Sequence, residues 1–265
     1  MARPTAIRTL LFISILIVLA GCRSRTEMIT QFEPAETDHE QLRSMLVDSD
    51  LSSLVQRVSE SFKLKETVFV CFREDPNGPR YEDNQIIMPY EFLAQTRAEL
   101  KDEDYKLSTS QLDRIVLSQA KFVLLHEIGH ALIDQLALPV VGKEEDAVDG
   151  LATLLAVGVL ESPEIALCAA VALDVSEDPE RDYMQQDFWN EHSLNAQRYY
   201  NILCWTHGGA PDWSTEIERL APEGWLEAKG DDCSAEYEKL ARNWKKLLKR
   251  HLKPGVVIRE KIKRG

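Results

Sequence analysis

The fold and the chemistry of this chain are decided by one stretch, which runs from Phe122 to Ile133 and reads Phe-Val-Leu-Leu-His-Glu-Ile-Gly-His-Ala-Leu-Ile. Its apolar residues are too dense for a surface loop and no proline interrupts them, so the stretch predicts a helix. Residues four apart on a helix project from one face, which places His126 and His130 side by side. Two imidazoles so placed can bind one zinc ion at about 2.0–2.1 Å each. Glu127, roughly 100° around the helix from His126, would lie beside the metal and act as general base on a metal-bound water.

The alternative for this stretch is a hydrogen-bonded pair of core histidines without a metal. Burying two histidines and a glutamate in an otherwise apolar helix is costly unless they have a partner, and a metal ion is a natural partner. The two variable positions of the motif, Ile128 and Gly129, are also uncharged. These features favour the metal site.

A second segment supplies carboxylates. Pro139 and Gly142 are expected to end the first helix, and residues 143–157 then read Lys-Glu-Glu-Asp-Ala-Val-Asp-Gly-Leu-Ala-Thr-Leu-Leu-Ala-Val. Acidic residues in the first turn favour a helix N-terminus. Within this cluster only Glu145 and Asp149 are four apart and share a face.

A catalytic zinc takes three protein ligands and an open position, and two histidines with a glutamate are an established set. Glu145 is therefore the predicted third ligand. A zinc-bound imidazole normally donates its other N–H to a carboxylate, the role predicted for Asp149. The alternative is that the acidic cluster only caps a helix and faces solvent.

Both segments resemble the gluzincin metallopeptidases, the thermolysin-like group, in which His-Glu-x-x-His is followed by Glu-x-x-x-Asp. Residues 190–201, which read Asn-Glu-His-Ser-Leu-Asn-Ala-Gln-Arg-Tyr-Tyr-Asn, narrow the resemblance to a bacterial family of zinc metallopeptidase-like proteins of unknown function. The similarity runs from about Thr67 to near Leu252. It implies the following roles: His126, His130 and Glu145 as zinc ligands, Glu127 as the base, and Asp149 as the carboxylate that supports His126.

The first residues of the chain predict export. Arg3 and Arg8 precede an apolar run at 10–20, which is too short to span a bilayer and is typical of a signal peptide. Residues 19–22, Leu-Ala-Gly-Cys, resemble the bacterial lipobox, which implies a lipid on Cys22. The expected organisation is a lipoprotein signal peptide at 1–21, a flexible tether at 22–40 and a metallopeptidase-like domain at 41–265. An ordinary signal peptide with an incidental cysteine is the alternative.

These features predict a location in the bacterial cell envelope. The chain would be lipid-anchored, and Arg23 after the lipidated cysteine favours the outer membrane, facing the periplasm. The whole chain has 31 Lys and Arg against 44 Asp and Glu. Removing 1–21 takes away two of the basic residues, which leaves 29 against 44, a charge of −15. Such an acidic surface argues against nucleic acid and against direct binding to anionic lipid. The expected partners are a peptide or protein substrate and the membrane, reached through the lipid anchor.

Four further cysteines lie in the predicted domain, and an oxidising compartment allows disulfides. Cys204 and Cys233 flank a stretch rich in glycine and proline, where a disulfide would restrain a loose loop. Cys71 with Cys168 follows only by elimination. A thiolate metal site is disfavoured because the chain has no Cys-x-x-Cys spacing.

The predicted fold class is α+β: a mostly helical zincin-like domain with a small β-sheet beside the active-site helix. Short β-like runs at 67–71 and 85–88, joined by a turn, predict a hairpin. By analogy with thermolysin-like folds, 85–88 is the strand whose edge would hold the substrate backbone. Helices are expected at about 41–60, 90–101, 110–137, 143–160, 163–174, 193–206 and 234–251, with Ser110 as the N-cap of the longest.

One more polar residue is a candidate for catalysis. Hydrolysis of a peptide needs a donor for the oxyanion that forms at the carbonyl. His192 is the candidate, with Tyr199 or Tyr200 as alternatives, although His192 could instead cap the following helix or face solvent. The motifs together predict a membrane-anchored zinc peptidase; the alternatives are a non-catalytic zinc-binding envelope lipoprotein and a zinc amidohydrolase acting on cell-wall peptides.

Overall fold

The computed structural model describes residues 26–102, 107–175 and 183–263. It confirms an α+β fold that is mostly helical, with one four-stranded sheet. The strands are β1 (Met28–Phe32), β2 (Val68–Arg73), β3 (Arg80–Glu82) and β4 (Gln85–Pro89). The α-helices are α1 (Glu40–Val47), α2 (Leu51–Ser61), α3 (Tyr90–Asp102), α4 (Thr109–Leu136), α5 (Glu144–Leu154), α6 (Pro163–Val175), α7 (Asn195–Gly209), α8 (Ser214–Leu220) and α9 (Trp225–Leu248). A π-helical turn (Leu155–Val159) continues α5, and 3₁₀ turns lie at Gln185–Phe188 and Pro211–Trp213.

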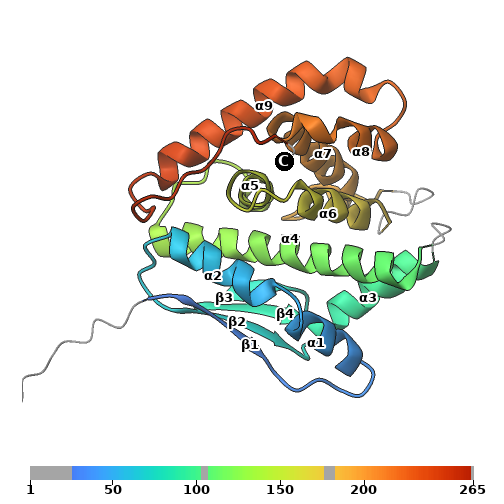
Figure 1. Cartoon of the computed structure of the whole chain (residues 1–265), viewed down its shortest axis with the longest axis vertical. Helices are drawn as coiled ribbons and strands as arrows, with labels where there is room; N and C mark the ends of the chain where they lie inside the picture. The colour runs from blue at the N-terminus through green and yellow to red at the C-terminus, as the bar shows by residue number, and fades with distance from the viewer. Residues whose placement is uncertain (1–25, 103–106, 176–182, 264–265) are drawn as a thin grey trace, which may run out of the picture.

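The long helix α4 crosses the middle of the molecule, with the sheet on one side and α5, α6 and α7 on the other (Figure 1). Its N-cap is Ser108, two residues before the predicted Ser110, in a reciprocal capping box with Gln111. Helix α9 covers the outer side of α7 (Figure 1). Among the described residues, no helix combines the length and the apolar character that crossing a membrane requires.

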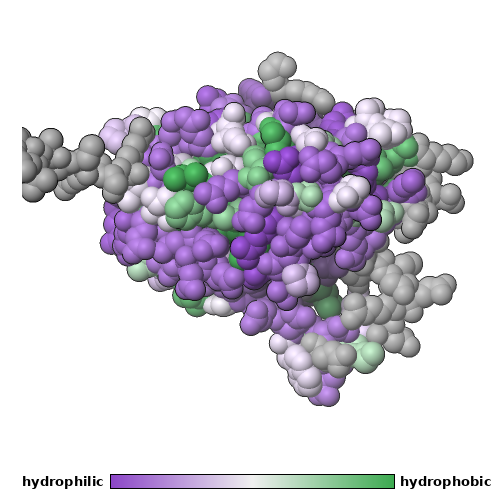
Figure 2. All heavy atoms as spheres, turned by 90° about the horizontal axis from the view of Figure 1, so that it is seen from below, coloured by the Kyte–Doolittle hydropathy of each residue, from purple (hydrophilic) through white to green (hydrophobic). Residues whose placement is uncertain are grey.

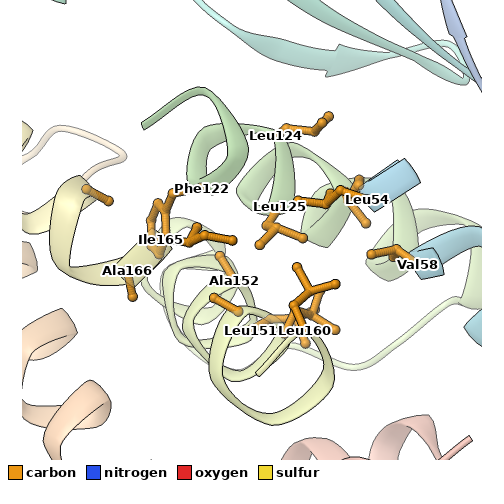
Figure 3. Close-up of a cluster of buried hydrophobic side chains, with 14 of the residues drawn as sticks. Leu54, Val58, Phe122, Leu124, Leu125, Leu151, Ala152, Leu160, Ile165 and Ala166 are labelled. Atoms are coloured by element: carbon orange, nitrogen blue, oxygen red, sulfur yellow. The ribbon is translucent and has the colours of Figure 1, made fainter. Parts of the chain in front are cut away.

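The core is built around α4 because that helix is apolar on nearly every side. Leu54 and Val58 of α2 approach it from one direction, and Leu151 of α5 and Ile165 of α6 from another (Figure 3). A helix that is apolar all round is expected to be buried on all sides. The side of the molecule that carries the sheet has a mostly hydrophilic surface with small hydrophobic areas (Figure 2).

The strand order is β1-β2-β4-β3, and this corrects the predicted hairpin. Strands β2 and β4 are parallel, not antiparallel, with Val70 opposite Ile86. The hairpin is formed by β3 and β4, joined by Asp83 and Asn84, both of which have positive φ angles. Such a two-residue turn matches the twist of antiparallel strands. Strand β3 has only three residues, too few for its pattern to be recognised in the sequence.

The edge of the sheet therefore differs from the prediction. The run 85–88 lies in β4, between β2 and β3, so it is not an open edge. Strand β3 forms the edge of the described sheet on the side of α4, which it contacts. A strand edge beside the metal-binding helix was expected, but it belongs to β3.

The predicted tether at 22–40 was wrong for the residues that form β1. Met28–Phe32 pair in parallel with β2, in register from Met28 with Val68 to Phe32 with Phe72. The acidic residues around this segment favoured the prediction of a tether, although the segment contains a short strand in which Met28 is buried. The expected signal peptide at 1–21 and Cys22 lie outside the described residues.

The helices also differ from the prediction in places. The run expected at 41–60 is two helices, because the chain turns at 48–50, where the Ser49 hydroxyl donates to the Leu46 carbonyl. Much of the stretch read as a loose loop is ordered into α8 and the first turns of α9. Helix α9 starts at Trp225, directly after Gly224, whose φ is +77°. Glycine adopts that left-handed conformation without steric cost.

The Cys204–Cys233 disulfide is confirmed and joins α7 to α9. The two helices are close enough that a Cβ on Gly208 would lie 2.5 Å from the Cys233 carbonyl oxygen. Cys71 and Cys168 are both free, so their pairing by elimination was wrong. Cys71 is in β2 and Cys168 in α6, on opposite sides of α4 (Figure 1).

Removing this disulfide should lower the free energy of unfolding by about 3–4 kcal/mol, because the crosslink closes a loop of 29 residues. The measurement is urea unfolding of Cys204→Ser/Cys233→Ser beside wild type. Cys168→Ala, which keeps the crosslink, is the control and should change stability by about 1 kcal/mol. Equal unfolding midpoints for wild type and the double variant would show that the crosslink does not stabilise the fold.

Candidate metal centre

The two segments that carry the motif meet where α4 and α5 cross. Gly129 of α4 faces Val148 of α5, and a Cβ on Gly129 would lie 3.0 Å from the Val148 side chain. The missing side chain thus allows the helices to approach closely. This crossing brings the first turns of α5 against the histidines of α4.

Both imidazoles turn their Nε2 atoms toward Glu145. His126 Nε2 lies 3.1 Å from Glu145 Oε2, and His130 Nε2 lies 3.4 Å from Glu145 Oε1. One ligand atom from each of the three residues lies within 4.8 Å of the others. Atoms bound to one tetrahedral zinc at about 2.0–2.1 Å would lie roughly 3.3 Å apart, so the set fits a metal ion with little adjustment.

The other nitrogen of each ring is also held by a carboxylate. His126 Nδ1 lies 2.8 Å from Asp149 Oδ1, and His130 Nδ1 lies 2.8 Å from Glu144 Oε1. Each Nδ1–H can donate to its carboxylate, which leaves the Nε2 lone pair directed at Glu145. This is the tautomer that a metal ligand requires. Asp149 thus makes the contact predicted for it, and Glu144 makes the equivalent contact with His130.

Asp149 is itself held by Arg198 of α7. Arg198 donates from Nε to Asp149 Oδ2 at 2.7 Å and from its terminal nitrogen to Oδ1 at 3.0 Å. Burial raises the pKa of Asp149, but the hydrogen bonds from His126 and Arg198 outweigh it and bring the pKa to about 2. Asp149 is therefore ionised at neutral pH, as its role as an acceptor requires.

The protonation of the ligands is set by the same contacts. Burial opposes ionisation of Glu145, but its hydrogen bonds with His126 and His130 lower its pKa. Burial lowers the pKa of His126, and its hydrogen bonds to Asp149 and Glu145 reverse this and raise the pKa to about 9. A metal ion competes with that proton for Nε2, so metal binding releases protons.

Glu127 lies beside the ligands and not among them. Its side chain is buried, and burial raises its pKa, an effect that nearby His126 and His130 partly offset. The backbone N–H of Tyr81, in the edge strand β3, also interacts with the Glu127 carboxylate. A carboxylate with a raised pKa beside a metal is suited to accept and return a proton.

Two hollows lie on either side of this cluster and together form one groove. One hollow, of about 410 Å³, runs between α3, α4 and α6, and the other, of about 690 Å³, extends past β3 and the start of α5. Pro79, His126, Glu127 and His192 line both hollows. The ligands and Glu127 are therefore accessible to a molecule that lies along the groove.

The structure places His192 at the site and removes both tyrosine alternatives. His192 Nδ1 lies 3.1 Å from Glu145 Oε2, and its side chain is 47% exposed. Tyr199 is buried and donates its hydroxyl to the Leu220 carbonyl. Tyr200 packs against Trp225. Neither tyrosine lines the groove.

Sequence reasoning missed Arg198, Glu144 and Tyr81. Arg198 lies 49 residues from its partner Asp149, and no helical spacing links residues so far apart. The contact of Glu144 with His130 Nδ1 is not indicated by the sequence, where Glu144 is one of several acidic residues in a first turn. Tyr81 lies in the unpredicted β3, where its hydroxyl donates to Asp134 at 2.8 Å. For Arg198 the available signal was its place in the run from Asn190 to Asn201, part of the family resemblance.

Asp149→Ala should weaken metal binding by about 10–100-fold while leaving the three ligands in place, because His126 loses the acceptor that orients it. The measurement is metal affinity by competition with a chelator. Asp146→Ala is the matched control: its carboxylate accepts from Ser193 at 3.0 Å and touches no ligand, so affinity should be unchanged. A larger effect at Asp146 than at Asp149 would contradict the assignment.

The comparisons with known proteins agree with this geometry. A family model described as "Putative metallopeptidase" matches residues 32–248, more than half of the 265 residues. The chain therefore belongs to that family. No match was found among curated proteins or among solved structures.

Proposed function

We propose that this member of the metallopeptidase family is a zinc-dependent peptidase, held at a membrane by a lipid on Cys22. The observation that carries the proposal is the convergence of both Nε2 atoms on Glu145, with buried Glu127 beside them in an open groove. Structural zinc normally has four closed protein ligands, whereas this set offers three. The three-ligand set favours catalysis over the zinc-binding lipoprotein without activity.

His126, His130 and Glu145 would hold the metal. Bound zinc would supply a Lewis acid that polarises a peptide carbonyl and lowers the pKa of a coordinated water. Glu127 would take a proton from the attacking water and deliver it to the leaving amine. Its burial supports this role, since the raised pKa brings the carboxylate closer to the pH at which it must both accept and donate.

His192 is proposed to stabilise the oxyanion. Its ring centroid is 6.2 Å from that of His126, and it lines both hollows. A donor beside the place where charge develops typically contributes about 10²–10³ in rate. Its contact with Glu145 would orient the ring, which is 47% exposed and lines both hollows.

The substrate backbone is proposed to lie along β3. This strand is one of the two edges of the described sheet, and its residue Tyr81 lines the groove and interacts with Glu127. An extended peptide can add to such an edge as one more strand through main-chain hydrogen bonds. This arrangement suits a peptide bound in an extended conformation.

The hollow between α3, α4 and α6 is proposed to receive a substrate side chain. Phe92, Phe122 and Ala169 form an apolar part of its wall, and polar side chains form the rest. Gln119 lines the same hollow, and its buried Oε1 has no hydrogen-bond partner among the described residues. An unpaired buried acceptor is costly, so a large apolar side chain that ends in a donor, such as tyrosine, suits this hollow.

The proposal is tested by metal content and peptide hydrolysis of wild type beside Glu127→Ala. The expected result is about one equivalent of zinc in both proteins and hydrolysis only by wild type. Zinc without hydrolysis of any peptide in a mixed-sequence library would favour the non-catalytic lipoprotein. Cleavage of cell-wall peptides alone would favour the amidohydrolase.

Cys22 should carry lipid, and the mature chain should fractionate with membranes. More than one acyl chain is expected, because a single chain gives only marginal binding. Cys22→Ser should release the protein or leave it unprocessed, as measured by fractionation and mass spectrometry. An unmodified Cys22 in the native protein would replace the lipoprotein with an ordinary exported enzyme.

A further inference from the structure

A cluster of cations lies where the C-terminal end of α9 meets the segment after α2. The Lys63 amide donates to the His251 carbonyl at 2.8 Å, and its ammonium donates to the Arg250 carbonyl at 3.2 Å. Phe62 pairs with Leu252 in an isolated bridge beside them. Arg250 donates from Nε to His251 Nε2 at 2.9 Å, and burial together with the charges of Arg250, Lys65 and Lys63 lowers the pKa of His251.

A groove of about 410 Å³ continues the cluster along α9. Its cationic lining consists of Arg242, Lys245, Lys246 and Lys249. Between these cations lie apolar side chains, including Leu252 and Val257, and Val257 is 70% exposed. We call the cations of the groove, together with Lys63, Lys65, Arg250 and Val257, the basic face.

Most of these charges are not neutralised within the chain. In the groove, Lys245 pairs with Glu260. In the part of the chain that the structure describes, no carboxylate lies within 4.0 Å of the other cations, namely Lys63, Lys65, Arg242, Lys246, Lys249 and Arg250. A chain with a formal net charge of −13 thus concentrates uncompensated positive charge at one end.

The first described residues of the chain contact the same face. The hydroxyl of Thr26, the first described residue, donates to the Leu64 carbonyl at 2.8 Å, between Lys63 and Lys65. The start of β1 and the C-terminal end of α9 lie on the same side of the molecule (Figure 1). Cys22 precedes Thr26 by four residues, a length that spans at most about 14 Å. A lipid on Cys22 would therefore hold the basic face close to the membrane surface.

We propose that the basic face docks on a membrane that contains anionic phospholipid, with Val257 at the interface. Each Lys or Arg near an anionic surface adds attraction, and the attraction falls off within a Debye length. A tether of four residues keeps Thr26, and with it the part of the face around Lys63 and Lys65, within about 14 Å of the lipidated residue. The acidic net charge, which argued against direct binding to anionic lipid, does not describe this end of the molecule. The docking needs no peptidase activity, but it rests on the lipid on Cys22, which is part of the proposed function.

The test uses the full chain with its N-terminal anchor, reconstituted in two kinds of vesicle: phosphatidylcholine alone, and phosphatidylcholine with phosphatidylglycerol. An amine-acetylating reagent is added, and mass spectrometry gives the modification rate of each lysine. We expect Lys63, Lys246 and Lys249 to react at least about threefold more slowly on the anionic vesicles. Lys101 and Lys229, which lie away from the face, should react equally on both. The protection should disappear at high salt.

Two charge-reversed variants complete the test. Lys246→Glu/Lys249→Glu should abolish the protection of Lys63, whereas the matched Lys101→Glu/Lys229→Glu should keep it. All four substitutions are at exposed positions, and circular dichroism checks that both variants fold. Two results would overturn the proposal. In the first, the lysines of the face react rapidly on both kinds of vesicle, so that nothing covers the face. In the second, they are equally protected on both, so that whatever covers the face does not depend on anionic charge.

Discussion

Glu127→Gln should retain the zinc ion and reduce peptide hydrolysis by about 10²–10⁴-fold, the usual contribution of a general acid–base group. The amide has nearly the shape of the carboxylate but cannot accept the proton of the attacking water. Glu127 is not among the three residues whose ligand atoms converge, so the ligand set is unchanged. The loss should therefore appear in kcat at full metal occupancy, measured on a peptide that wild type cleaves.

The matched control for this change is Glu191→Gln. Glu191 lines the same hollow as Glu127 but is exposed and is not one of the convergent ligands. The control removes the same charge from the groove and should keep most of the activity. Equal turnover by Glu127→Gln and wild type would exclude Glu127 as the base. Equal losses in both variants would assign the effect to the charge of the groove and not to proton transfer.

The residues of the candidate metal centre could be predicted from the sequence because its parts are local. His126 and His130 are one helical turn apart, as are Glu145 and Asp149, so spacing alone places each pair on one face. The sequence could not show how α4 and α5 cross. That depends on Gly129 meeting Val148, a contact between side chains of two helices. The ligand set of a catalytic zinc joined the two pairs into one predicted site, and the resemblance to a known family implied the same roles.

The sheet was the part that sequence reasoning handled worst. Its strands have three to six residues, and parallel pairing between β1 and β2 brings together segments 40 residues apart. A run of five residues such as β1 carries little periodicity, and acidic neighbours gave it the composition of a tether. The turn at Asp83–Asn84 was a usable signal, since both residue types tolerate a positive φ. It would have placed the hairpin between β3 and β4.

Removing both histidines should abolish metal binding. Purified wild type should contain about one equivalent of zinc, and His126→Ala/His130→Ala should contain almost none after dialysis. Glu145 would be the only ligand left of the three whose atoms lie within 4.8 Å of one another. One carboxylate does not hold zinc at the affinity of a three-ligand site. His207→Ala is the control, because His207 lies in α7 near Ser214 and away from the ligands.

Thermal unfolding gives a second measure that needs no substrate. A ligand that binds only the folded state stabilises it by RT ln(1 + [L]/Kd), about 4 kcal/mol at a thousandfold excess over Kd. A chelator should therefore lower the unfolding temperature of wild type and of His207→Ala but leave that of the double variant unchanged. Stoichiometric zinc in the double variant would move the metal site elsewhere. A chelator effect of equal size in all three proteins would mean that the stabilising metal is not bound by these histidines.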